Sequence, residues 1–112
     1  MKTITKSLVV ASIFLSSSAF AGIACTGNVD SWKVHSNGTL YVNGSMVEGG
    51  GSGMLCKVNE AHKSIEPDTC KSIVAQVVTA QATDRELLVY MDGSSCHYQA
   101  YNYGNVVYVQ VQ

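Results

Sequence analysis

The chain is short of basic residues. Only five Lys or Arg follow residue 21, against eight Asp or Glu, so this part of the chain carries a formal charge of −3. Nucleic-acid binding needs a basic face that neutralises phosphates, and docking on an anionic membrane needs a basic patch. We therefore expect neither nucleic acid nor an anionic membrane surface as a partner.

Long apolar runs and metal-binding motifs are also missing. The apolar run at residues 8–15 is far shorter than the ~20 residues that span a bilayer, so we expect no membrane insertion. Neither Cys-x-x-Cys nor His-x-x-x-His occurs, and such closely spaced pairs are typical of zinc sites. We therefore expect no metal and no cofactor.

Residues 1–21 have the pattern of an export signal. Lys2 and Lys6 give a positive start, the apolar run follows, and Ala19-Phe20-Ala21 matches the small-x-small site that signal peptidases cut. We expect cleavage after Ala21, which leaves a single domain at residues 22–112. That domain is expected to be exported, to the periplasm or out of the cell.

The four cysteines all lie within residues 22–112. An even number in a small exported domain predicts two disulfides. The sequence alone leaves three pairings open, of which we favour Cys56–Cys70, closing a short loop, and Cys25–Cys96, closing a long one. In the chain-entropy model each is worth ~3–5 kcal/mol of stability.

A β-hairpin is predicted at residues 32–43, with Asn37-Gly38 as a two-residue turn. This register puts Val34 opposite Tyr41. It also places Leu40 and Val42 on the face of Lys33 and His35. Five glycines and two serines at residues 44–53 then predict a flexible loop or a strongly bent entry into the next strand.

The later elements alternate between strand and helix patterns. Strands are predicted at residues 54–58 and 87–91, and residues 97–112 read as one or two strands whose last part places Val107, Val109 and Val111 on one side. A helix is predicted from Pro67 because proline and acidic residues favour a helix start. Its apolar positions recur at helical spacing: Cys70, Ile73, Val74, Val77 and Val78.

The element order is therefore β-β-β-α-β-β. This order is typical of the OB-fold, a mainly β fold in which one helix closes the end of a small five-stranded barrel. A helix packed on an open antiparallel sheet is the alternative.

Catalytic motifs are not evident. Residues 92–97 bring together an acid, two serines, Cys96 and His97, but Cys96 is expected to be oxidised, and neighbouring strand residues point to opposite faces. We therefore predict no enzymatic activity.

The aromatic tail is the candidate ligand site. Tyr98, Tyr101 and Tyr103 lie close together with Asn102 between them, and Trp32 is a further candidate. A tyrosine ring and an amide suit a sugar or a polar protein surface. The alternative is that these rings fill the core.

The predicted third strand, helix and fourth strand resemble the corresponding segments of a known family. The segments that carry it are Met54-Leu55-Cys56, Cys70-Lys71-Ser72-Ile73-Val74, Ala80-Gln81-Ala82, residues 84–90 and Cys96. They resemble small exported bacterial proteins like the B subunit of subtilase cytotoxin and, more distantly, other AB5-toxin B subunits built on the OB-fold. The resemblance implies a ring-forming, carbohydrate-binding subunit without catalytic activity. The alternative is an exported inhibitor or envelope factor that binds another protein, for which the loop at residues 44–53 is the candidate contact.

Overall fold

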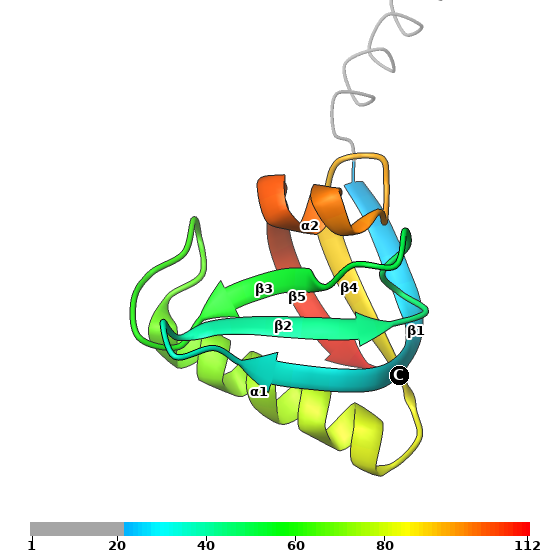
Figure 1. The fold of residues 1–112 in the computed structure, drawn as a ribbon, viewed down its shortest axis with the longest axis horizontal. Coiled ribbons are helices and arrows are strands. Elements are labelled where there is room, and N and C mark those ends of the chain that lie inside the picture. The colour runs from blue at the N-terminus through cyan, green and yellow to red at the C-terminus, as the bar shows by residue number, and fades with distance from the viewer. Residues whose placement is uncertain (1–21) are drawn as a thin grey trace, which may run out of the picture.

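The computed structural model describes residues 22–112, and Figure 1 shows their fold. The predicted export signal lies outside the described residues. Five antiparallel strands form one sheet in the order β3-β2-β1-β4-β5, and two helices pack against it. The elements are β1 (Gly22–Val34), β2 (Thr39–Gly44), β3 (Gly53–Lys57), α1 (Pro67–Ala82), β4 (Glu86–Asp92), α2 (Tyr98–Tyr103) and β5 (Asn105–Val111). The predicted mainly β class with one main helix is confirmed.

β1 is the strand that both halves of the sheet share. Its residues 22–28 pair with β4, and its residues from Val29 onward pair with β2 across a register shift between Val29 and Ser31. The strand bends between its two halves, so β4 and β5 run across the direction of β2 and β3 (Figure 1). Within residues 22–112, β3 and β5 are the two edges of the sheet.

The core lies between the curved sheet and α1. The helix begins at Pro67 as predicted, and it buries Cys70, Ile73, Val77 and Ala80 against the sheet. Val78, predicted to belong to this stripe, is 38% exposed and lies on the outer side. No helix among the described residues has the length and apolar character needed to cross a bilayer.

Both favoured disulfides are confirmed. Cys25 on β1 is bonded to Cys96 just before α2, and Cys56 on β3 is bonded to Cys70 on α1. Cys25, Cys56 and Cys70 are buried, whereas Cys96 is partly exposed. The two bonds therefore tie α2 to β1 and α1 to β3.

The predicted hairpin exists, but its predicted register was wrong by one residue. Val34 pairs with Leu40, and Lys33 pairs with Tyr41. The connection contains three residues, 36–38, with Gly38 at φ +89°, and His35 N–H donates to the Thr39 carbonyl at 2.9 Å. Leu40 and Val42 therefore point inward, away from the face that carries Lys33 and His35.

The predicted strand at the start of the tail was also wrong. Residues 98–103 form the short helix α2, because His97 accepts a hydrogen bond from the Gln99 N–H at the helix start. In β5 a register shift lies opposite Tyr90 and Met91. This bulge breaks the predicted alternation, so Val106 is buried with the sheet interior whereas Val107 is 50% exposed.

Candidate functional site

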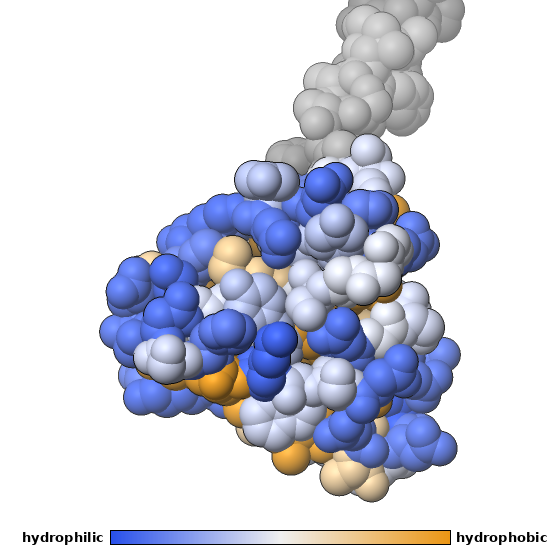
Figure 2. Space-filling model, in the orientation of Figure 1, coloured by the Kyte–Doolittle hydropathy of each residue, from blue (hydrophilic) through white to orange (hydrophobic). Residues whose placement is uncertain are grey.

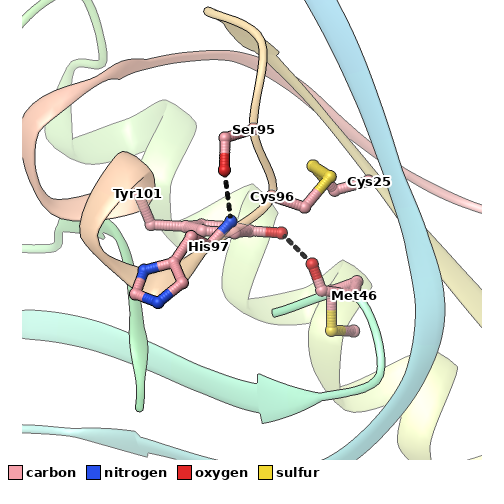
Figure 3. The surroundings of a disulfide bond; sticks show 6 residues. All are labelled: Cys25, Met46, Ser95, Cys96, His97 and Tyr101. Carbon is pink, nitrogen blue, oxygen red and sulfur yellow. Dashed lines mark hydrogen bonds between the residues drawn. A yellow bond between two sulfur atoms is a disulfide. The ribbon is translucent and has the colours of Figure 1, made fainter. Parts of the chain in front are cut away.

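The loop at residues 44–53 lies directly against α2. Glu48 N–H donates to the Cys96 carbonyl at 2.9 Å, and Tyr98 N–H donates to the Glu48 carbonyl at 2.8 Å. Since Cys96 is also bonded to Cys25, the start of α2 is fixed to both the loop and β1 (Figure 3). The loop and α2 thus form one continuous surface at one end of the fold.

This loop makes hydrogen bonds at both of its ends and packs two side chains into the core. Met46 and Val47 are buried in the core. At one end Ser45 and Asn28 exchange two hydrogen bonds, with Asn28 N–H donating to Ser45 Oγ and Ser45 N–H to the Asn28 carbonyl. At the other end Asn43 accepts from the Ser52 hydroxyl at 2.9 Å. A glycine-rich composition predicts freedom of the backbone but does not reveal such contacts.

Tyr101 is a core residue. Its side chain is 1% exposed, and its hydroxyl donates to the Met46 carbonyl at 2.6 Å (Figure 3). Burial raises the pKa of the Tyr101 hydroxyl well above its ordinary value, and the negative charge of Glu48 raises it further. Of the predicted tyrosines, this one packs α2 onto the loop and offers no free ring face.

Tyr98 and His97 line the contact between α2 and the loop. Their ring centroids are 4.5 Å apart. Gly51 lies so close to the Tyr98 ring that a Cβ there would approach ring carbons within 2.5 Å, and a Cβ at Gly49 would come within 2.3 Å of His97 Nε2. The glycines of the loop thus leave room for both rings close to its backbone.

Tyr103 is the exposed member of the group, with 84% of its surface accessible. It borders a shallow depression of about 350 Å3, which we call the α2 depression. The residues that line it are Ser95, His97, Gln99, Ala100 and Tyr103. No Lys, Arg, Asp or Glu is among them, and the face of α2 in Figure 2 is polar to neutral.

The structure does not bring Trp32 to this depression. Trp32 lies on the second half of β1, where its indole N–H donates to Gln81 Oε1 at 3.1 Å and Gln81 donates onward to the Asp30 carbonyl at 2.9 Å. The ring is half-buried and packs between β1 and the end of α1. Asn102, on α2, has a buried Oδ1 without a hydrogen-bond partner.

The histidines and cysteines show no catalytic arrangement within residues 22–112. Cys96 is oxidised, and His97 Nδ1 accepts the Gln99 N–H. His35 contacts the Tyr41 ring edge-on, with centroids 5.2 Å apart. Burial, and then Lys63 and Lys57, lower the pKa of His62, which Glu60 partly opposes. Among the described residues no three His, Cys, Asp or Glu side chains gather as a metal site would require.

A stacked pair of tyrosines on β4 and β5 was not predicted from the sequence. Tyr90 on β4 and Tyr108 on β5 pair across the sheet and stack, with centroids 5.2 Å apart and planes within 10°. Tyr108 also lines a groove between α1 and β5. The groove depends on how α1 packs against β5, which no local sequence pattern encodes.

Comparison of the chain with models of protein families, with curated proteins and with solved structures finds no match.

Proposed function

We propose that this chain is an exported, non-enzymatic binding module that recognises carbohydrate through the α2 depression. The observation that carries the proposal is Tyr103, a large ring that is 84% exposed on a short helix fixed by a disulfide. A sugar ring binds to such an aromatic face through its C–H groups, and its hydroxyls need nearby hydrogen-bonding groups.

The rest of the depression supplies such groups without net charge. Ser95 and Gln99 carry a hydroxyl and an amide, and the His97 ring lies beside them. Because α2 is bonded to β1 through Cys25–Cys96 and to the loop through backbone hydrogen bonds, binding would order few additional groups. Such preorganisation lowers the entropic cost of binding.

The proposed fold is OB-like, in keeping with the toxin B-subunit resemblance. In support, β1 pairs with both β2 and β4, and α1 stands between β3 and β4 in the chain. The proposed export agrees with two disulfides in a small domain, since such bonds persist in oxidising compartments. Assembly into a ring of several copies is part of the same proposal.

The second candidate function is inhibition or binding of another protein through the loop. Glu48, Gly49 and Gly50 are exposed at its tip while Met46 and Val47 anchor it in the core. A loop that is rigidly held and exposed at its tip is a common way to present a contact to a partner protein.

The experiment is a screen of an immobilised neutral and acidic glycan panel with the oxidised, processed protein. We expect binding that Tyr103→Ala weakens about tenfold or more. Tyr41→Ala removes a tyrosine that contacts His35 and does not line the α2 depression, and it should leave binding unchanged. A screen without binding would contradict the carbohydrate proposal. If Glu48→Ala abolished binding to a protein partner and Tyr103→Ala left that binding unchanged, the second candidate would be supported instead.

The mass of the oxidised protein in solution, measured by light scattering on a sizing column, tests the ring. A closed assembly of several copies supports it, whereas a monomer contradicts that part of the proposal and leaves the carbohydrate site to the glycan screen.

A further inference from the structure

The two disulfides differ in how solvent reaches them. Cys56 and Cys70 are each 0% exposed, and their bond lies between β3 and α1. Cys25 is 1% exposed, whereas its partner Cys96 is partly exposed just before α2. Thiol–disulfide exchange begins when a thiolate attacks one sulfur of the bond, so its rate depends on access to that sulfur. Cys96 is therefore the cysteine at which an external thiol reacts most readily.

The chain that leads to Cys96 leaves its approach open. Residues 92–95 are all exposed, and a Cβ at Gly93 would have no neighbouring atom within 4 Å. Cys25 lies at the other end of the bond, buried in the part of β1 that pairs with β4 (Figure 3). A thiolate that arrives from solvent therefore attacks Cys96 and expels Cys25, the buried sulfur.

The segment that carries Cys96 is a connection whose two ends are fixed by the sheet. It spans residues 93–104, between β4 and β5, and Asp92 pairs with Asn105 where these two strands meet. The helix α2 lies within this connection and buries one residue, Tyr101. A helix of six residues is too short to be stable by itself in water, so α2 depends on its contacts with the rest of the fold.

The disulfide is the covalent contact among those that hold α2, and it joins the connection to β1. Without it, α2 would be held to the loop by the two backbone hydrogen bonds of Glu48 and by the Tyr101 hydroxyl. The ladder between β4 and β5 and the bond between Cys56 and Cys70 would remain. Opening of the exposed disulfide should therefore loosen the connection locally and leave the sheet and α1 in place.

The α2 depression lies entirely on this connection. Its lining residues are Ser95, His97, Gln99, Ala100 and Tyr103, all within residues 93–104. A looser connection would no longer hold them in one arrangement, and a ligand would then have to order them at an entropic cost. The state of the disulfide thus sets how well the depression is preorganised.

We propose that Cys96 is a site of thiol–disulfide exchange with a dithiol, and that opening of the Cys25–Cys96 bond releases α2 and turns off binding at the α2 depression. The exchange itself stands on the exposure of Cys96 and on the topology of the connection. Its effect on ligand binding rests on the function proposed above.

The exchange transfers two electrons in two steps. In the first, a thiolate of the dithiol forms a bond to Cys96 Sγ, the Cys25–Cys96 bond breaks, and Cys25 leaves with the electron pair and takes up a proton from water. In the second, the other sulfur of the dithiol, as a thiolate, attacks the sulfur bonded to Cys96, which leaves and is protonated in turn. The dithiol ends as a disulfide, oxidised by two electrons, and the protein ends with two thiols.

The test treats the oxidised, processed protein with dithiothreitol, a small dithiol, under native conditions. Free thiols are trapped with iodoacetamide at intervals, and peptide mass spectrometry identifies the modified cysteines. We expect the Cys25–Cys96 bond to open at least about tenfold faster than Cys56–Cys70. Glutathione, a monothiol, should form its mixed disulfide on Cys96 and leave Cys25 as the free thiol.

Hydrogen exchange of the protein in dithiothreitol tests the structural consequence. The amides of Glu48, Tyr98 and Gly104 are hydrogen-bonded to carbonyls of the loop or the connection, and we expect them to exchange at least about tenfold faster after selective opening. Amides of α1 and of the ladder between β1 and β4 should keep their protection. Glycan binding at the α2 depression should weaken about tenfold in the same sample.

A matched control is Cys56→Ser with Cys70→Ser, which keeps the exposed disulfide and should leave its rate of opening unchanged. The comparison of the two bonds within the wild-type protein needs no variant, so it decides the point even if this control does not fold.

Opening of both disulfides together, or of Cys56–Cys70 first, would overturn the proposal, because access would then depend on unfolding of the whole domain. A glutathione adduct on Cys25 would overturn the assigned point of attack. Selective opening that leaves the three amides protected would overturn the release of α2. Selective opening with faster exchange, together with a glycan screen that finds no ligand, would support the exchange site while contradicting the proposed carbohydrate function.

Discussion

At the scale of single residues, Tyr101 shows how one hydroxyl connects distant parts of the chain. The sequence placed it in the candidate ligand cluster and left open that its ring fills the core. In the structure the ring is in the core, and the hydroxyl bonds the carbonyl of Met46, 55 residues earlier in the chain. Local composition predicts an aromatic cluster but does not predict which ring turns inward, because that depends on the loop it meets.

Replacement of this hydroxyl tests its structural role. Tyr101→Phe leaves the buried Met46 carbonyl without its partner, so we expect the free energy of unfolding to fall by about 1–3 kcal/mol in urea titrations of the oxidised protein. Tyr103→Phe is the control, since its exposed hydroxyl should matter by less than about 0.5 kcal/mol. Equal effects of the two changes would show that the Tyr101 hydrogen bond contributes little.

The same residue should make the fold sensitive to high pH. The folded state raises the pKa of Tyr101 above its ordinary 10.0 and so favours the protonated hydroxyl. Its contribution to stability is full below pH 10 and is lost as the pH rises above that value. Wild type should therefore lose stability above pH 10 more steeply than Tyr101→Phe when the free energy of unfolding is measured by urea titration at a series of pH values.

At the scale of elements, the sequence predicted those with a strong period and missed those set by contacts. The helix at Pro67 and the strand at residues 87–91 have clear apolar patterns and are present. The hairpin was off by one residue because the turn takes three residues, and α2 was missed because a six-residue helix depends on the His97 cap and on the loop that it covers. Of the site, the tyrosine cluster was predicted, whereas the Tyr108 groove required the packing of α1 on β5.

The contact between β1 and the loop gives a prediction at this scale. A Cβ at Gly27 would lie 2.2 Å from Ser45 Oγ and 2.5 Å from the Met46 nitrogen, so the loop can approach β1 only because this residue is glycine. Gly27→Ala should lower the free energy of unfolding by about 1–3 kcal/mol in urea titrations, because the backbone of the loop at Ser45 and Met46 would have to move away from β1.

Thr26→Ala, at an exposed neighbour on the same strand, is the control and should cost roughly 0.5 kcal/mol. A Gly27→Ala protein as stable as wild type would mean that the loop can shift away from β1 without loss.

At the scale of the whole molecule, the two disulfides act on loops of different length. Cys25–Cys96 links residues 71 positions apart, and Cys56–Cys70 links residues 14 apart. In the chain-entropy model, loss of the first should cost about 4 kcal/mol and loss of the second about 3 kcal/mol. Denaturant unfolding of the paired Ser variants, Cys25→Ser with Cys96→Ser and Cys56→Ser with Cys70→Ser, measures both values.

A larger loss of stability on removal of Cys56–Cys70 than on removal of Cys25–Cys96 would show that local packing outweighs loop length. The first pair should in addition loosen α2, and hence weaken binding at the α2 depression, because Cys96 precedes that helix directly. The second pair serves as the matched control for this effect, since it joins β3 to α1 instead.

The thirteen residues of β1 make the two halves of the sheet inseparable. In one half β2 forms its hydrogen bonds with β1, and in the other half β4 does the same. Unfolding of either half therefore disturbs the strand with which the other half pairs. The molecule should accordingly melt in one cooperative step, without a half-folded state that exposes a sheet edge to aggregation. This all-or-none behaviour limits the time during which unpaired strands are exposed as the protein folds.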